Sequence, residues 1–181
     1  MKKFELTTET KINIFGKKLF RIKALISFGP ISAGEKGGWV EKEENLSQSG
    51  NAWVSGNAEV SGNAYVSGNA WVSGNAEVSG DAYVSGNAEV SGNAEVSGDA
   101  EVSGNACVRD NADYTTIHGF GTQFRTTTFF RCKDKEIRVS CGCFYGTISE
   151  FREQVKRTRK GKIAEEYLMI ADLMEKHFKE E

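Results

Sequence analysis

The stretch Gly50-Asn51-Ala52-Trp53-Val54-Ser55 opens a run of ten consecutive hexapeptides that continues without insertion to Arg109. Every copy fits the pattern Gly-[Asn/Asp]-Ala-x-Val-[Ser/Arg], and a degenerate eleventh copy at 110–115 stays in phase. Side chains of Ala-x-Val-Ser alternate, so Ala and Val share one face while x and Ser share the other. The Gly-Asn or Gly-Asp that follows tolerates left-handed backbone angles, which predicts a tight corner after each short strand.

Three such units close one triangular coil of 18 residues. Successive coils are expected to stack about 4.8 Å apart through parallel-strand hydrogen bonds, with Ala and Val filling the interior. A right-handed solenoid is the alternative architecture. A second alternative is a disordered low-complexity tract, but a flexible linker would not require Val and Ala to recur at fixed positions.

The repeat resembles the hexapeptide-repeat, left-handed parallel β-helix family. The resemblance rests on Val-Ser-Gly-Asn-Ala-x, in which an aliphatic residue is followed four places later by a small one, with Asn at the corner. The predicted fold is therefore mainly β: a left-handed triangular solenoid with an amino-terminal β cap and a carboxy-terminal module of one β-hairpin and two helices. The expected domains are 1–49, 50–115 and 116–181.

A coil of this size places every third x residue on the same outward face. Face one is expected to carry Trp53, Trp71, Glu89 and Cys107; face two Glu59, Glu77, Glu95 and Asp113; face three Tyr65, Tyr83 and Glu101. The corners form further columns: Asn51, Asn69, Asn87 and Asn105; Asn57, Asn75, Asn93 and Asn111; and Asn63, Asp81 and Asp99.

These columns predict a surface for a partner. Stacked like charges destabilise a sheet, and exposed stacked aromatic residues invite contact, so both are costly unless something uses them. The partner-binding candidates are Trp53, Trp71, Tyr65, Tyr83, Glu59, Glu77, Glu95, Asp81 and Asp99. The alternatives are that the acids are solvated and prevent aggregation, and that the aromatic rings only steady the coil. On the first interpretation, alanine variants of Trp53 and Trp71 fold normally and lose association.

Charge is distributed unevenly along the chain. The 23 basic and 25 acidic residues give a net charge of −2, yet residues 1–49 carry +3, residues 50–115 carry −8 and residues 116–181 carry +3. This pattern favours a charge-complementary contact, within an oligomer or with a basic host protein, over binding of duplex DNA along the coil. No apolar run approaches the roughly 18 residues of a membrane span. The charged start at 1–7 is unlike a secretory signal, so we expect a cytoplasmic protein.

The flanking segments are expected to cap the coil, because an open end exposes strand edges and apolar core. Residues 11–27 predict a hairpin with its turn at Gly16-Lys17, and residues 28–49 predict an irregular first coil. Farther on, residues 126–132 and 137–143 predict antiparallel strands. Thr147-Ile148-Ser149-Glu150 is a capping box that starts a helix, and a second helix is expected over 163–178. The basic run 156–162 between the helices is interpreted as a solvated turn, with contact to phosphate or an acidic partner as the alternative.

The sequence predicts no catalytic residue, cofactor or metal. Hexapeptide-repeat proteins are often acyltransferases or zinc carbonic anhydrases, which implies histidines on or between the coils, but His118 and His177 both lie outside the repeats. His118 follows the last coil and could still line a cleft between subunits. Cys132, Cys141 and Cys143 could form a three-sulfur site, but their spacing matches no zinc motif, and reduced thiols in a hairpin are the preferred interpretation.

The layout also resembles uncharacterised hexapeptide-repeat proteins of phages and prophages. The residues that carry this resemblance are Phe20-Arg21-Ile22-Lys23-Ala24-Leu25, Gly37-Gly38-Trp39-Val40, Glu44-Asn45-Leu46-Ser47 and Val139-Ser140-Cys141-Gly142-Cys143-Phe144. It implies a non-enzymatic factor that blocks or sequesters a component of the bacterial host, such as a defence element, and acts as a homo-oligomer with a trimer as the default. The rival functions are an acyltransferase at a subunit cleft, a structural element of the virion, and a nucleotide-sequestering sponge that stacks bases on Trp53, Trp71 or Tyr65.

Overall fold

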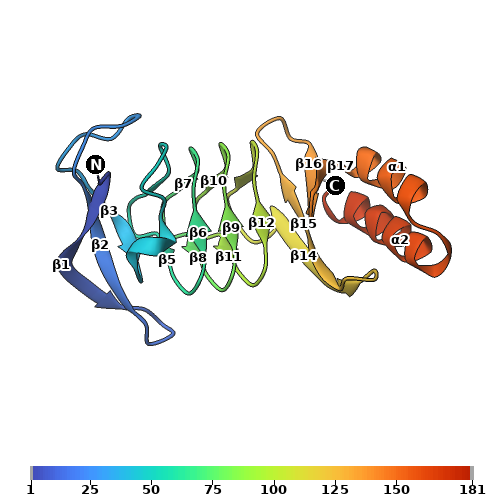
Figure 1. Cartoon of the computed structure of the whole chain (residues 1–181), viewed down its shortest axis with the longest axis horizontal. Coiled ribbons are helices and arrows are strands. Elements are labelled where there is room, and N and C mark those ends of the chain that lie inside the picture. Colours follow the sequence, from blue (N-terminus) through green and yellow to red (C-terminus); the bar gives the residue numbers. More distant parts are fainter. Residues whose placement is uncertain (1, 180–181) are drawn as a thin grey trace.

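The structure is a computed structural model that describes residues 2–179. Stacked coils form the middle of a rod, a long hairpin lies at one end, and a sheet backed by two helices lies at the other (Figure 1). No helix within 2–179 has the length and apolar character needed to cross a bilayer.

The elements before and after the repeats are longer than those within them. The strands of the amino-terminal part are β1 (Phe4–Ile12), β2 (Lys18–Ala24) and β3 (Lys36–Val40), followed by the 3-10 turn η1 (Glu43–Asn45). The repeats form β4 (Trp53–Val54), β5 (Glu59–Val60), β6 (Tyr65–Val66), β7 (Trp71–Val72), β8 (Glu77–Val78), β9 (Tyr83–Val84), β10 (Glu89–Val90), β11 (Glu95–Val96), β12 (Glu101–Val102) and β13 (Cys107–Val108). The carboxy-terminal part comprises β14 (Tyr114–Phe120), β15 (Arg125–Arg131), β16 (Ile137–Cys141), β17 (Phe144–Thr147), α1 (Ile148–Thr158) and α2 (Gly161–His177).

The predicted three-sided parallel solenoid is confirmed. Its faces are the parallel ladders β4-β7-β10-β13, β3-β5-β8-β11 and β6-β9-β12. Residues 18 apart are paired, as in Trp53 with Trp71 and Tyr65 with Tyr83. The repeat therefore sets the register, because a slip of one residue would turn the valines out to solvent.

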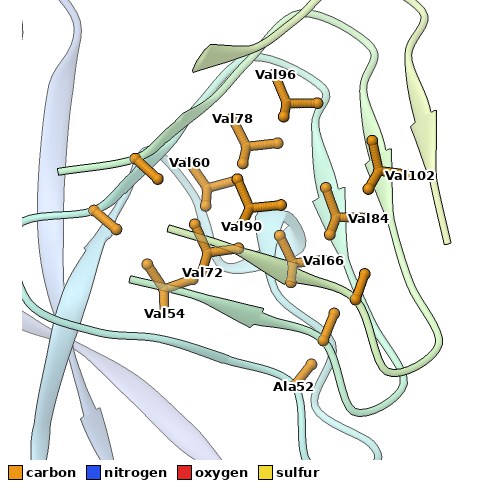
Figure 2. Packing of buried hydrophobic residues seen from close by; sticks show 14 of the residues in the cluster. Ala52, Val54, Val60, Val66, Val72, Val78, Val84, Val90, Val96 and Val102 are labelled. Carbon is orange, nitrogen blue, oxygen red and sulfur yellow. The ribbon is translucent and has the colours of Figure 1, made fainter. Parts of the chain in front are cut away.

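The interior of the prism is dry and aliphatic. Every Ala and Val of the ten repeats is at most 1% exposed, and the valines of all three faces point inward (Figure 2). Each corner turns at its glycine, as at Gly86, where φ is +68°. Only glycine adopts this angle at little cost, which is one reason why the first position of the hexapeptide never varies.

The amino-terminal segment completes the first coil and closes it. Trp39-Val40 pairs in parallel with β5, and Leu46 bridges to Val66, so residues 28–49 supply coil strands as predicted. The hairpin β1-β2 joins β3 in antiparallel fashion and extends face two beyond the coil. Its turn contains Gly16 at φ +75°, as predicted.

Trp53 is fully buried, so the expectation that it lies on the surface is wrong. Its ring lies edge-on to Phe4 and Phe28, with centroids 6.5 and 5.4 Å away. A Cβ on Gly37 would lie 2.6 Å from the ring, so the glycine leaves the room that the tryptophan occupies. An alanine at this position would leave a large cavity in the cap and destabilise the fold.

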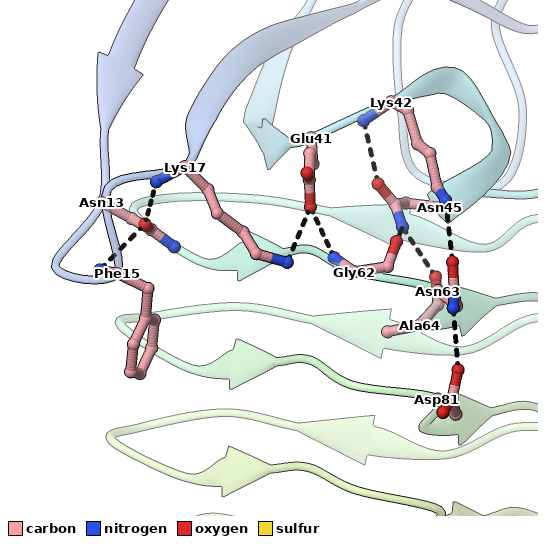
Figure 3. A network of polar contacts seen from close by, with 10 residues as sticks. All are labelled: Asn13, Phe15, Lys17, Glu41, Lys42, Asn45, Gly62, Asn63, Ala64 and Asp81. Carbon is pink, nitrogen blue, oxygen red and sulfur yellow. Dashed lines mark hydrogen bonds and ion pairs between the residues drawn. The ribbon is translucent and has the colours of Figure 1, made fainter.

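Side chains satisfy backbone groups at both ends of the solenoid. Within it, Trp53 N donates to Ala70 O of the next coil at 3.0 Å. The equivalent carbonyl groups of the first coil have no preceding repeat above them, and side-chain donors satisfy them. Lys3 Nζ donates to Ala52 O at 2.8 Å, and Asn45 Nδ2 donates to Gly62 O and Ala64 O at 3.1 and 2.8 Å (Figure 3).

Replacing Lys3 with methionine is expected to remove a pH-dependent contribution to stability. Burial lowers the pKa of Lys3 from its ordinary value of 10.5 to about 8. Between these values the unfolded chain holds a proton that the folded chain has lost, so stability rises with pH in this window. Wild type should gain about 1 kcal/mol over the Lys3→Met variant between roughly pH 7.5 and pH 9, as measured by chemical denaturation.

The comparison of the two proteins isolates this lysine. Burial raises the pKa of the Cys132 thiol to about 11, but that thiol titrates equally in both proteins and cancels in the difference. A stability difference that stays constant across the window would contradict the assignment of the low pKa to Lys3.

At the last coil, side-chain oxygen atoms accept hydrogen bonds from backbone N–H groups. Glu95 N donates to Asn111 Oδ1 at 2.8 Å, and Glu101 N donates to Thr128 Oγ1 at 3.0 Å. The predicted continuation of face two to Asp113 is wrong, because the chain leaves the coil after Arg109. The eleventh copy lacks both the corner glycine and the core valine, whose places are taken by Asp110 and Tyr114.

A four-stranded antiparallel sheet, β14-β15-β16-β17, covers this end of the coil. Phe130 joins the core of the solenoid, while its neighbour Phe129 joins a second core with α1 and α2. The two predicted strands and the capping box of Thr147 and Glu150 are confirmed. The second of those strands ends at Cys141 instead of Cys143, because Gly142 turns the chain at φ +62°.

Candidate functional site

Face one does not form an exposed aromatic column. Trp53 is buried beneath the cap, Trp71 is half-buried against the core, and Cys107 is buried. Glu89 forms an ion pair with Lys133 at 2.7 Å. This face is therefore occupied by contacts within the chain for much of its length.

Face two is an acidic column whose first member is neutralised. Lys11 reaches from β1 to Glu59 at 2.6 Å and also lies 4.7 Å from the centroid of the Trp39 ring. Glu77 and Glu95 follow in register on the next two coils. Burial, and after it the charges of Glu59 and Glu95, raise the pKa of Glu77.

The corner between faces two and three continues the acidic surface. Lys42 Nζ donates to Asn63 Oδ1 at 3.1 Å, and Asn63 Nδ2 donates to Asp81 Oδ1 at 2.9 Å (Figure 3). Asp99 lies one coil farther on and accepts a hydrogen bond from Thr126 Oγ1 at 3.4 Å. The other two corners carry asparagine ladders, as in Asn51 to Asn69 at 3.1 Å and Asn57 to Asn75 at 3.2 Å.

Four of these acids form no ion pair with any residue of 2–179. In the part of the chain that the structure describes, no ion pair involves Glu77, Asp81, Glu95 or Asp99. We call these four residues the acidic edge. Like charges on adjacent coils repel one another, so the acidic edge costs stability in the isolated chain.

Face three adds aromatic rings beside the acidic edge. Tyr65 and Tyr83 stack in register, with centroids 5.8 Å apart and planes tilted by 31°. Tyr83 is 41% exposed, whereas the other aromatic residues of the repeats are buried or half-buried. Beyond it, a hollow of about 320 Å³ separates face three from the β16-β17 turn, with Glu101 and Tyr145 among its lining residues.

The histidines and cysteines do not gather into a metal-binding group in the described part of the chain. His118 is exposed on β14, with Nδ1 3.2 Å from Thr126 Oγ1. Cys132 is buried, Cys141 is half-buried at the end of β16, and Cys143 is exposed in the turn that follows, so Cys141 and Cys143 do not lie on the same strand. Residues 2–179 contain no group of three or more His, Cys, Asp or Glu that could hold a metal ion.

Two exposed apolar surfaces were missed by the sequence analysis. Ile14 and Phe15, at the tip of the β1-β2 hairpin, are 83% and 65% exposed, and Phe15 points away from the polar network at its base (Figure 3). Met169 and Leu173 are exposed one turn apart on α2. The first surface could have been predicted from the sequence, because two apolar residues directly precede the predicted turn at Gly16-Lys17.

Comparison of the chain with models of known protein families and with the curated proteins finds no match. Function is therefore inferred from the surface geometry.

Proposed function

We propose that the protein is a non-enzymatic binding protein of phage or prophage origin that blocks or sequesters a basic host protein. The acidic edge and Tyr83 form the contact surface, and the solenoid holds them at fixed spacing. The proposal includes the hexapeptide-repeat family and a homotrimer, which come from the resemblance of the sequence. It also includes a location in the bacterial cytoplasm, which comes from the charged start of the chain and the lack of a long apolar run.

The observation that carries this proposal is the difference between paired and unpaired acids. Glu59 and Glu89 each form an ion pair with a lysine of the flanking segments, whereas the four residues of the acidic edge form no ion pair within 2–179. The repulsion among them is relieved if a partner supplies the positive charge. Tyr83 adds an amphipathic ring of the kind enriched at binding surfaces.

Neutralising the acidic edge is expected to abolish capture of the host partner. The test variant combines Glu77→Gln, Asp81→Asn, Glu95→Gln and Asp99→Asn, and is called the neutral-edge variant. Both asparagines match residues that already form corner ladders, so the fold should be retained. Affinity purification from host lysate at low and high salt measures the effect, because exposed ion pairs weaken with screening.

A second variant with the same loss of charge provides the control. It carries glutamine at Glu5, Glu44, Glu136 and Glu165, which are exposed acids outside the acidic edge. Partner capture should persist in this control. Equal capture by wild type and the neutral-edge variant would refute the proposed function, and equal loss in both variants would reduce it to a dependence on net charge alone.

An acyltransferase is the second candidate, and one observation favours it. His118 contacts Thr126, which in turn donates to Asp99, so an exposed imidazole is connected to a carboxylate beside the last coil. A histidine placed in this way could act as a general base in a cleft between subunits. Turnover of acyl-CoA donors that disappears in His118→Ala would replace the binding proposal with this one.

A further inference from the structure

The hollow beside face three has walls that are held in place before any partner arrives. Tyr83 forms one side, where its ring stacks on Tyr65 and its hydroxyl oxygen lies 3.1 Å from Ser67 Oγ. Tyr145 forms another side, and its hydroxyl is hydrogen-bonded to Cys132 and to the backbone of Asn105. Burial raises the pKa of Tyr145, so the ring is a neutral phenol at physiological pH.

A carboxylate lines the same hollow as these rings. Glu101 follows Tyr83 in the face-three ladder and is exposed. Its Oε2 accepts a hydrogen bond from Ser140 Oγ at 2.7 Å, and its backbone N–H is fixed by Thr128. The hollow therefore offers one oriented negative charge next to two exposed aromatic rings, which are 41% and 46% exposed.

We infer that this hollow receives the guanidinium group of an arginine side chain. The inference rests on the proposed function, since the arginine belongs to the basic partner. A guanidinium group is planar, stacks on aromatic faces and forms paired hydrogen bonds to a carboxylate. A lysine ammonium is a compact, strongly hydrated charge that uses the flat aromatic walls less well.

The reactivity of the Cys143 thiol can show whether a ligand occupies the hollow. It lines the hollow and is exposed, whereas Cys107 and Cys132 are buried and Cys141 is half-buried. The probe is the blocked tripeptide acetyl-Gly-Arg-Gly-amide, with versions that carry citrulline or lysine in place of arginine. The rate of alkylation of Cys143 by iodoacetamide, followed by peptide mass spectrometry, measures how far each probe protects the thiol, and alkylation of Cys141 serves as the internal reference.

The arginine probe should slow alkylation of Cys143 several-fold at saturation, and the citrulline probe, which lacks the charge, should not. Glu101→Gln keeps an acceptor for Ser140 and removes the charge, so the concentration for half-protection should rise about tenfold, which corresponds to roughly 1.4 kcal/mol. Tyr83→Leu should weaken protection in the same direction. Equal protection by arginine and citrulline, or protection unchanged in Glu101→Gln, would overturn the inference, as would stronger protection by lysine.

The same variants separate this inference from the proposed function. The neutral-edge variant retains Glu101, Tyr83 and Tyr145, and should still be protected by the arginine probe. If wild type and Glu101→Gln capture the host partner equally while the neutral-edge variant captures none, the hollow is not used and only the proposed function stands.

Discussion

Replacing Val78 with aspartate is expected to abolish cooperative folding of the solenoid. Val78 is 1% exposed and lies in the ladder between Val60 and Val96, where it is surrounded by the aliphatic interior. A carboxylate at this position would be buried without a partner, at a cost of several kcal/mol. Since the free energy of unfolding of a domain is only about 5–15 kcal/mol, this cost removes a large part of it. Val72→Asp, on another face, should have the same effect.

Thermal unfolding followed by circular dichroism measures the effect. The matched control is Asn75→Asp, which adds the same charge at an exposed corner three residues away. Aspartate already occupies a corner at Asp81, where it accepts a hydrogen bond from the preceding coil, so this control should melt near wild type. A cooperative transition of Val78→Asp within a few degrees of wild type would contradict a dry interior.

The coil could be predicted because its determinants are local. Six residues encode one strand and one corner, and the valine at the fifth position returns to the same side in every copy. Neighbouring coils then meet with identical residues in register, as Val60 meets Val78. No contact distant in sequence is needed to decide which side chains point inward.

The surface of the coil could not be predicted from the same repeat. Trp53 and Trp71 occupy equivalent positions in the pattern, yet Trp53 is buried, because Phe4 and Phe28 cover it from segments outside the repeats. Glu59 differs from Glu77 for the same reason, since Lys11 from outside the repeats forms its ion pair with Glu59. The hollow at Glu101 likewise depends on Tyr145, which is 44 residues later in the chain.

The caps follow a physical rule that their sequence alone does not reveal. Each end of a stack of parallel strands leaves backbone N–H and C=O groups without a partner, so both ends need groups that satisfy them. Donors from Lys3 and Asn45 serve the first end, and acceptors from Asn111 and Thr128 serve the second. Both ends are closed by side chains, which disfavours end-to-end addition of further coils.

Gly86→Ala is expected to destabilise the solenoid by about 2–4 kcal/mol, of which only part comes from backbone strain. Gly86 has φ +68°, and a Cβ there would lie 2.8 Å from Gly104 N and 3.0 Å from Gly104 O on the next coil. These are backbone atoms at a fixed rung spacing, so they cannot move away without stretching the ladder. The substitution therefore tests whether the corners must be glycine for reasons of space as well as angle.

Gly98→Ala is the matched control, because Gly98 has φ +65° but no atom within 4 Å of a Cβ. It should cost only the strain of alanine in the left-handed region, about 1–2 kcal/mol. Alanine also reduces the freedom of the unfolded chain, but this effect is the same at both sites and cancels in the comparison. Equal losses in chemical denaturation would mean that the angle alone selects glycine. A larger loss at Gly86 would show that contact between stacked corners keeps this position invariant, and that the column tolerates a side chain only where no coil follows.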